Sequence, residues 1–327
     1  MLVTDYNSVK FRWLSLAAIL CVVLGHCHLD GGCLERVLIP VFAQWHVPWF
    51  FVLSGMFLHF SCERYSCSSL LLKKMKSLCM PYLIWCAWGI LVLQQPWSGI
   101  DAEIGLTSAF PTGNVNLWYL HCLIVFTVVA LILFGCVRHW GRKTIWGMAY
   151  CVFFVVCFCL KIWTLVGTPT SPFYFAAGFL LAPRLLSPRN GERSNWKLFS
   201  VVSLVAIFLR VMWFKAGATG AVEIGLRSAC VVSMITAVWV GYDVLAQRQI
   251  LKRFPEWLNV VFFVYCFHGP VLFWLRKWWI GLFGHGDLAC DVGMLALWLI
   301  VSILSFSVGN IMRVCSPRIY HLLSGGR

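Results

Sequence analysis

RWLSLAAILCVVLGHCH, residues 12–28, is an apolar run that begins with an arginine and ends with histidines. If it is helical, Ser15 and His26 lie eleven residues apart, about 16 Å along the axis at about 1.5 Å per residue. Eleven steps of about 100° return to nearly the same face, and Arg12 falls close to the same stripe. The stretch predicts one helix with a polar stripe that leads from its basic end to an imidazole. Because an ionisable group inside a membrane span is costly, His26 is a candidate functional residue.

The composition is that of a protein embedded in lipid. Hydrophobic residues make up 61% of the 327 residues and charged residues 12%, and the mean hydropathy is +0.82. Soluble domains carry about 25% charged residues, so this chain cannot cover itself with a polar surface and is expected to be a polytopic membrane protein. No polar stretch is long enough for a separate globular domain. Residues 1–327 are therefore expected to form a single integral-membrane domain.

Ten stretches have the length and apolar content of membrane spans, which need about 20 mostly apolar residues. Their run lengths and the lack of alternating polarity favour helices over a barrel. The predicted fold class is therefore all-α, a bundle of about ten transmembrane helices. The ten stretches are 12–29, 41–60, 77–95, 115–137, 144–162, 170–187, 197–214, 226–246, 257–280 and 289–313.

The basic residues are distributed over the connections in the alternating way that the positive-inside rule describes. With the N-terminus in the cytoplasm, the inner connections receive most of the 26 Lys and Arg residues, and the outer ones collect acidic residues. We therefore expect both termini in the cytoplasm. This topology accounts for the net charge of +14, so no nucleic-acid partner is expected. The inner basic residues include Lys10, Arg64, Lys73, Lys74, Lys76, Arg248, Lys252, Arg253 and Arg313.

The same alternation assigns a depth to each histidine. His26, His46 and His121 fall near the outer ends of three predicted spans, and His268 falls near mid-membrane. A lone buried histidine usually has a structural role, but three at matching depth favour a functional site in the outer half of the bundle. The histidines at span ends or in loops, expected at the surface, are His59, His139, His285 and His321.

Sixteen cysteines are scattered along the chain, with no CxxC pair and no Cys/His spacing typical of a zinc site, so no metal is expected. Most lie in apolar runs, where cysteine behaves as a small hydrophobic residue. Cys27 and Cys33 flank the first loop and are either two free thiols or a disulfide formed in an oxidising compartment. The N-terminus has the order of a signal peptide without an A-x-A cleavage pattern, so we expect a retained first span.

Six blocks of the sequence resemble the membrane-bound acyltransferase-3 family and occur in the family's order. The most specific is WHVPWFFVLSGMFL at 45–58, whose histidine before Val-Pro is similar to the fucose-4-O-acetylase-like and surface-polysaccharide O-acyltransferase branch. The others are VVLGH at 22–26, KKMKSLCMPYLIW at 73–85, LWYLHCLIVF at 117–126, FYFAAGFLLAPR at 173–184 and FFVYCFHGPVLF at 262–273.

The resemblance implies transfer of an acyl group, commonly acetyl, from cytoplasmic acyl-CoA to a hydroxyl on a cell-surface polysaccharide or a lipid-linked sugar. It implies a bacterial inner (plasma) membrane location, with acyl-CoA as donor substrate and no tightly bound cofactor. In the family a basic residue precedes the catalytic histidine by eleven positions, and that histidine matches His26. The basic position is Ser15 here, which is a departure, and Arg12 is a candidate to reach the same place along the helix face.

Acyl transfer to an alcohol needs a base that takes the hydroxyl proton, and the near-neutral pKa of histidine suits this task. His26 is the candidate base and His46 the second candidate catalytic histidine. Ser54, Trp118 or a second histidine are candidate donors to the tetrahedral oxyanion. Ser54 and Gly55 also have the small size that allows close helix packing in membranes.

The KKMK cluster at 73–76 borders the inner end of a predicted span. One interpretation is capture of the CoA phosphates, and the other is anchoring by the positive-inside rule. The residues concerned are Lys73, Lys74 and Lys76.

His121 and His268 are further candidates for substrate binding. His268 precedes Gly269 and Pro270, where we expect a helix break that forms a cavity wall. The tryptophans at the outer ends of the second and fourth spans either mark the membrane interface or stack on a sugar; these are Trp45, Trp49 and Trp118.

A transporter or flippase for a glycan or small solute is the competing hypothesis, because intramembrane histidines and broken helices are expected there too. The lack of a recognisable inverted repeat favours the enzyme. A third hypothesis, suggested by Ser15, is an inactive relative retained as a partner subunit. Acyl-CoA, a sugar acceptor and membrane lipid are the expected partners, and the sequence does not specify an oligomeric state.

Overall fold

A computed structural model shows the chain as an assembly of helices and describes residues 5–42, 45–93, 117–137, 143–160, 162, 168, 170–185, 196–216, 220–248 and 250–326. None of these residues lies in a strand, which confirms the all-α class for the described part. The elements are α1 (Asp5–His26), α2 (Cys33–Phe42), α3 (His46–Arg64), α4 (Cys67–Leu93), α5 (Trp118–Val137), α6 (Lys143–Cys159), α8 (Ser171–Leu185), α9 (Trp196–Ala216), α10 (Gly220–Gln247), the 3-10 helix η4 (Glu256–Leu258), α11 (Val261–Phe283), α12 (Asp287–Cys315) and α13 (Pro317–Ser324).

Each of the ten predicted spans overlaps one of these helices. In the described part of the chain, six helices are long and apolar enough to cross a membrane, namely α1, α4, α5, α9, α10 and α12. α6 and α8 have only 17 and 15 residues, and α3 and α11 are not among the six. The chain is thus an integral membrane protein with six candidate spans, and the prediction of about ten is not confirmed.

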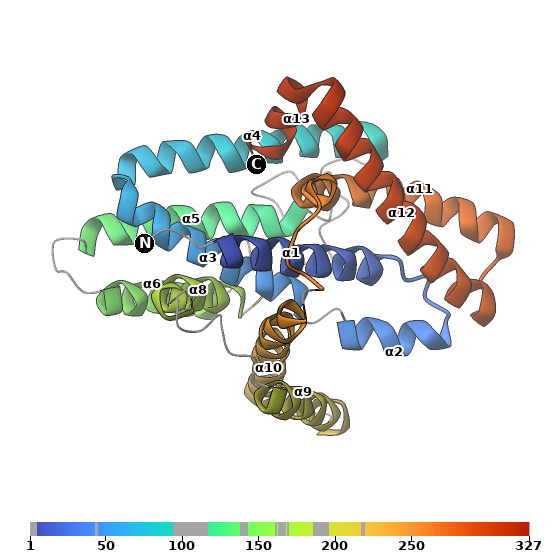
Figure 1. Ribbon diagram of the computed structural model, residues 1–327, viewed down its shortest axis with the longest axis horizontal. Helices are drawn as coiled ribbons and strands as arrows, with labels where there is room; N and C mark the ends of the chain where they lie inside the picture. Colours follow the sequence, from blue (N-terminus) through green and yellow to red (C-terminus); the bar gives the residue numbers. More distant parts are fainter. Residues whose placement is uncertain are drawn as a thin grey trace.

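α1 is the central helix. It lies in the middle of Figure 1 and packs against α3, α10, α11 and α12. Ala18, Ile19 and Val23 on α1 are inaccessible to solvent. Residues 12–26 are therefore surrounded by protein over much of their length, which explains how this apolar run tolerates polar residues.

Two glycines bring α3 and α8 into backbone contact. A Cβ at Gly55 would collide with the carbonyl oxygen of Phe175, and a Cβ at Gly178 with that of Val52. Small residues at matching positions allow membrane helices to approach this closely. The prediction that Gly55 serves close packing is confirmed, and the contact fixes the wall of the cavity that α3 contributes.

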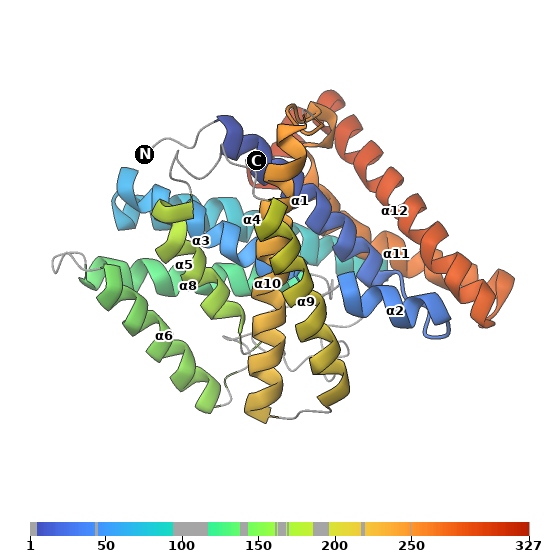
Figure 2. The same cartoon turned by 60° about the horizontal axis from the view of Figure 1, so that its bottom comes forward.

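α9 and α10 form a hairpin, and Figure 2 shows them side by side. α9 is strongly apolar, yet only 6% of its residues 196–213 are buried inside the protein. Exposed apolar side chains over a whole helix are typical of contact with lipid. α10 joins this hairpin to α1.

Four local expectations are wrong. α11 continues through Pro270 without a break at Gly269. His59, expected at the surface, is buried against Phe179 with ring centroids 5.0 Å apart. Lys10 is buried within α1, because α1 begins well before the predicted span. Trp45 and Trp49 lie in the core and therefore neither mark an interface nor offer a face to a sugar.

Candidate functional site

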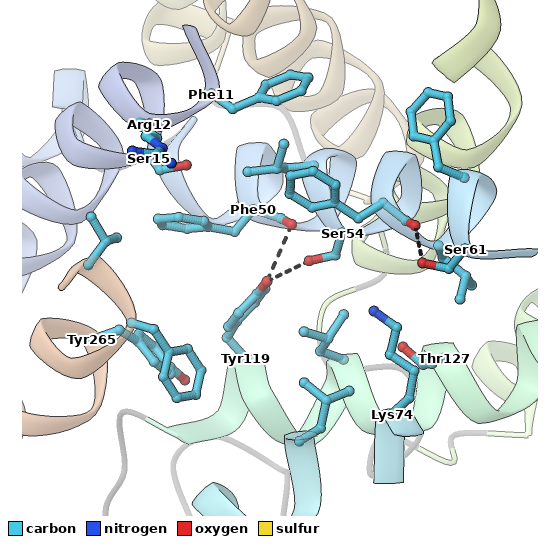
Figure 3. Close-up of a pocket in the computed structure, with 18 of the residues that line it drawn as sticks. Phe11, Arg12, Ser15, Phe50, Ser54, Ser61, Lys74, Tyr119, Thr127 and Tyr265 are labelled. Carbon is cyan, nitrogen blue, oxygen red and sulfur yellow. Dashed lines mark hydrogen bonds between the residues drawn. The ribbon is translucent and has the colours of Figure 1, made fainter. Parts of the chain in front are cut away.

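A cavity of about 650 Å³ lies between α1, α3, α4, α5 and α11. This volume is within the range of about 300–1,000 Å³ common for small-ligand sites. Figure 3 shows side chains from several helices converging on it. Its polar lining residues are Arg12, Ser15, Ser54, Ser61, Arg64, Tyr65, Lys74, Tyr119, Thr127, Asn259, Tyr265 and Tyr320.

The cavity is electropositive. Arg12, Arg64 and Lys74 come from three different helices, and no Asp or Glu is among the described lining residues. The Arg12 guanidinium donates to Glu256 at 3.0 Å, but both side chains are substantially exposed, 38% and 72%. An exposed ion pair of this kind contributes little free energy, so Arg12 remains available to an anion that enters the cavity.

Tyr320 adds a neutral donor at the edge of the cavity. Burial raises the pKa of its phenol, against the opposing effect of Arg313. The Tyr320 hydroxyl therefore stays protonated at neutral pH and adds hydrogen-bonding capacity without adding negative charge.

Ser54 and Tyr119 form a hydrogen-bonded pair inside the cavity. The Tyr119 hydroxyl donates to the carbonyl oxygen of Phe50 at 3.3 Å and lies 3.0 Å from Ser54 Oγ. Figure 3 shows both contacts. Because the Tyr119 proton is directed at Phe50, the Ser54 hydroxyl is the donor to Tyr119.

A pair of histidines lies near the cavity but is not part of its lining. The rings of His26 on α1 and His268 on α11 have centroids 5.5 Å apart. His268 Nδ1 is 3.0 Å from the carbonyl oxygen of Val264, which assigns the proton to Nδ1 and makes Nε2 an acceptor. No described residue hydrogen-bonds that Nε2, although His268 is fully buried.

Further polar groups surround His26. His46, His28 and Arg276 are close enough to interact with it electrostatically. His28 and Arg276 each lie 3.8 Å from a carboxylate oxygen of Asp30. The histidine cluster therefore borders the end of the molecule at which α1 and α11 meet acidic loop residues.

Tyr265 lies beside both the cavity and His268. It lines the cavity on one side, and its ring centroid lies 6.4 Å from that of His268. Its hydroxyl accepts a hydrogen bond from the Leu120 amide at 3.3 Å. Tyr265 thus borders the electropositive space and neighbours one member of the imidazole pair.

The structure sorts the predicted site residues into two groups and several outliers. The cavity residues are Arg12, Ser15, Ser54 and Lys74, and the histidine cluster is His26, His46 and His268. The predicted meeting of His121 with His26 is not seen, since His121 lies beside Tyr82 with centroids 6.3 Å apart. Trp118 packs on Phe51, Lys73 lies over the Tyr65 ring and Lys76 is exposed.

Three cavity residues are not among the site residues predicted from the sequence, namely Tyr119, Tyr265 and Arg64. Both tyrosines lie inside quoted blocks, in LWYLH and FVYCFH, as polar groups within apolar helices. An intramembrane polar residue is itself a signal of function, so the two tyrosines could have been predicted from the sequence. Arg64 was assigned to anchoring because it follows the end of a predicted span.

The fold and the cavity define an integral membrane protein that places a cation-lined ligand space next to a buried histidine pair. The chain belongs to the acyltransferase-3 family, whose model, described as an acyltransferase domain, matches residues 11–313. The matched range contains both histidines and every cavity residue named above except Tyr320. No curated protein and no solved structure matches the chain. The protein is thus an acyltransferase.

Proposed function

We propose that the chain is an O-acyltransferase that moves an acyl group, acetyl in the simplest case, from cytoplasmic acyl-CoA to a sugar hydroxyl. The acceptor is a cell-surface polysaccharide or a lipid-linked sugar. The enzyme works in the bacterial inner membrane with both termini in the cytoplasm, so that the cavity receives its donor from the inside.

The observation that carries this proposal is the pairing of an electropositive cavity with an adjacent imidazole pair. Acyl-CoA brings several phosphate charges and a long, mostly neutral arm. Arg12, Arg64 and Lys74 supply the cations for the phosphates. Apolar walls formed by Phe50, Phe262 and other residues suit the rest of the donor.

Arg12 takes the place of the basic residue that the family carries at the position of Ser15. Both residues line the same cavity, on opposite sides of Trp13 and Leu14 in the chain. This supports the idea that the cation has moved one helical turn along α1 without leaving the ligand space. Ser15 alone is therefore no argument for an inactive relative.

In the proposed reaction His26 takes the proton of the acceptor hydroxyl while the hydroxyl oxygen attacks the thioester carbonyl carbon. A tetrahedral oxyanion forms, and His46 is the second histidine available to stabilise it. The oxyanion collapses, the carbon–sulfur bond breaks, and the histidine returns its proton to the leaving CoA thiolate. The ring of His268, whose centroid lies 5.5 Å from that of His26, packs beside the proposed base and limits its movement.

In this proposal the Tyr265 ring, which lines the cavity one helical turn from His268, rotates to connect the cavity with the histidines. Rotation of one side chain costs less free energy than movement of a whole helix. Closure of the ring after donor entry also keeps the thioester away from water.

The test is His26→Ala in membranes supplied with radiolabelled acetyl-CoA, with label followed into the glycan fraction. Loss of a general base lowers the rate by about 10²–10⁴-fold, while CoA binding persists because His26 does not line the cavity. His285→Ala, at an exposed histidine, is the matched control. Unchanged acylation by a membrane-inserted His26→Ala protein would refute the assigned base.

A further inference from the structure

A buried ionic contact joins α1 to α10. Lys10 Nζ donates to Asp243 Oδ1 at 2.7 Å, and the two side chains are only 2% and 9% exposed. The Tyr6 hydroxyl donates to the same carboxylate oxygen. Lys10 Nζ also lies 3.7 Å above the centroid of the Trp239 ring, a cation–π contact.

The four residues form a two-by-two arrangement. Tyr6 and Lys10 are one turn apart on α1, and Trp239 and Asp243 are one turn apart on α10. Rotation of α1 would move the Lys10 ammonium off the Trp239 ring, and translation by one turn, about 5.4 Å, would separate both donors from Asp243. The arrangement, which we name the register lock, therefore fixes both the rotation and the axial position of α1.

The register lock controls where Arg12 points. Two residues along a helix correspond to about 200° of rotation, so a Lys10 held against α10 directs Arg12 to the opposite face. That face lines the cavity, and Arg12 also contacts Glu256, which is not a lining residue, at 3.0 Å.

The segment that follows α10 is fixed by the same arrangement. The Tyr242 hydroxyl, next to Asp243, donates to the Leu251 carbonyl at 3.3 Å. Phe254 packs edge-on against Trp13 at 5.1 Å. Asn259, further along, lines the cavity. The segment with Phe254 and Asn259 and the face of α1 that carries Arg12 therefore both depend on how α1 packs against α10.

A buried ion pair is weak evidence for stability, because desolvation offsets its attraction, and its best-attested use is to select one arrangement of packed helices. We propose that Lys10 and Asp243 are positioning residues that hold the Arg12 guanidinium in the donor cavity. This rests on the proposed function, in which Arg12 binds the donor phosphates. A pair that only attached the α9–α10 hairpin would affect folding and leave donor binding unchanged.

The experiment measures CoA affinity of the full chain in nanodiscs by calorimetry. Lys10→Met and the double variant Lys10→Met/Asp243→Leu should each weaken CoA binding about tenfold, the usual effect of losing a hydrogen bond to a charged group. The double variant leaves no unpaired buried charge and should keep the thermal midpoint of the parent. Lys10→Arg should restore affinity. Lys277→Met removes a lysine with a similar aromatic contact, over Phe273, and should bind CoA like the parent.

A coupling test separates positioning from other effects. If Lys10 acts through Arg12, Lys10→Met should have no further effect on CoA affinity in an Arg12→Ala background. Unchanged affinity in the folded double variant, or an undiminished effect in the Arg12→Ala background, would overturn the proposal. In acylation assays the donor KM should rise while kcat stays within about twofold.

A second readout does not depend on CoA. With Ser15→Cys, mass spectrometry follows alkylation of residue 15, which lines the cavity. Lys10→Met should lower this alkylation rate several-fold, since rotation of α1 turns residue 15 away. If Arg12→Ala binds CoA normally, the donor site of the proposed function is wrong, and the labelling rate alone decides whether the register lock positions this face of α1.

Discussion

At the residue scale, the most informative positions are Arg12 and Ser15. Arg12, the proposed donor-binding cation, lies three residues from the basic position that the resemblance implies, and this shift would abolish function if only one point on α1 reached the ligand. The cavity instead contacts Phe11, Arg12 and Ser15 in succession, so a long arginine side chain can deliver its charge from either end of that turn.

Because residues 12 and 15 face the same cavity, an arginine at position 15 should replace Arg12. Arg12→Ala should raise the donor KM at least about tenfold through loss of charge-assisted contacts to phosphate. Adding Ser15→Arg should recover most of that loss, because residue 15 faces the same space. The measurement is the donor KM of both variants, with Ser15→Gln as the uncharged control of similar reach. No recovery by Ser15→Arg would show that Arg12 has a role that position 15 cannot fill.

The histidines show what sequence reasoning resolves at this scale. Depth along each helix was sufficient to group His26 with His46, because positive-inside alternation and rise per residue are local properties. It failed for His121, since depth says nothing about which way a helix face turns. Only packing assigns the facing direction, and it directs His121 toward Tyr82 and His268 toward His26.

At the element scale, helix positions followed from hydrophobic runs while several boundaries and faces did not. Every predicted span overlaps a helix, since lipid leaves the backbone no other common way to satisfy its hydrogen bonds. Lys10 lies outside the first predicted span, which begins at residue 12, but inside α1. Its partner Asp243 lies more than two hundred residues away, and no local pattern reveals such a pair.

The α3–α8 contact supports a prediction of its own. Gly178→Val should destabilise the protein by about 1–3 kcal/mol, because the new side chain meets the Val52 carbonyl and overpacked contacts cost about that much. Because Ser54 is two residues from Val52, it should shift with α3, and this shift should weaken donor binding as well. Gly225→Val, on α10 with open space around its Cβ position, is the matched control. Equal thermal midpoints in detergent for the two variants would contradict the close contact.

At the scale of the whole molecule, the two ends differ in charge. The cavity end brings together Arg12, Arg64 and Lys74 from three helices. The opposite end of α1 holds acidic contacts, with Asp291 accepting from the Leu34 amide at 2.9 Å and Asp30 near Arg276. The positive-inside rule describes such a distribution, so these contacts agree with the proposed orientation, in which the cavity opens to the cytoplasm.

Native cysteines make this orientation measurable. Cys33 follows α1, Cys159 ends α6 and Cys315 ends α12, and all three are exposed free thiols. Cys27 is also a free thiol, but burial raises its pKa to about 12, against the opposing effect of Arg276.

If the proposed orientation is right, a membrane-impermeant maleimide added to intact spheroplasts should label Cys33 and Cys159, and Cys315 only after lysis. Cys27 should stay unlabelled from both sides at neutral pH, because a thiol with a raised pKa holds almost no thiolate. Site-specific mass spectrometry reads all four sites in one sample, with single Cys→Ser variants as controls. Labelling of Cys315 before lysis would show that the orientation is the reverse of the one proposed. The electropositive cavity would then face outside the cell, without the route for cytoplasmic donor on which the proposed reaction depends.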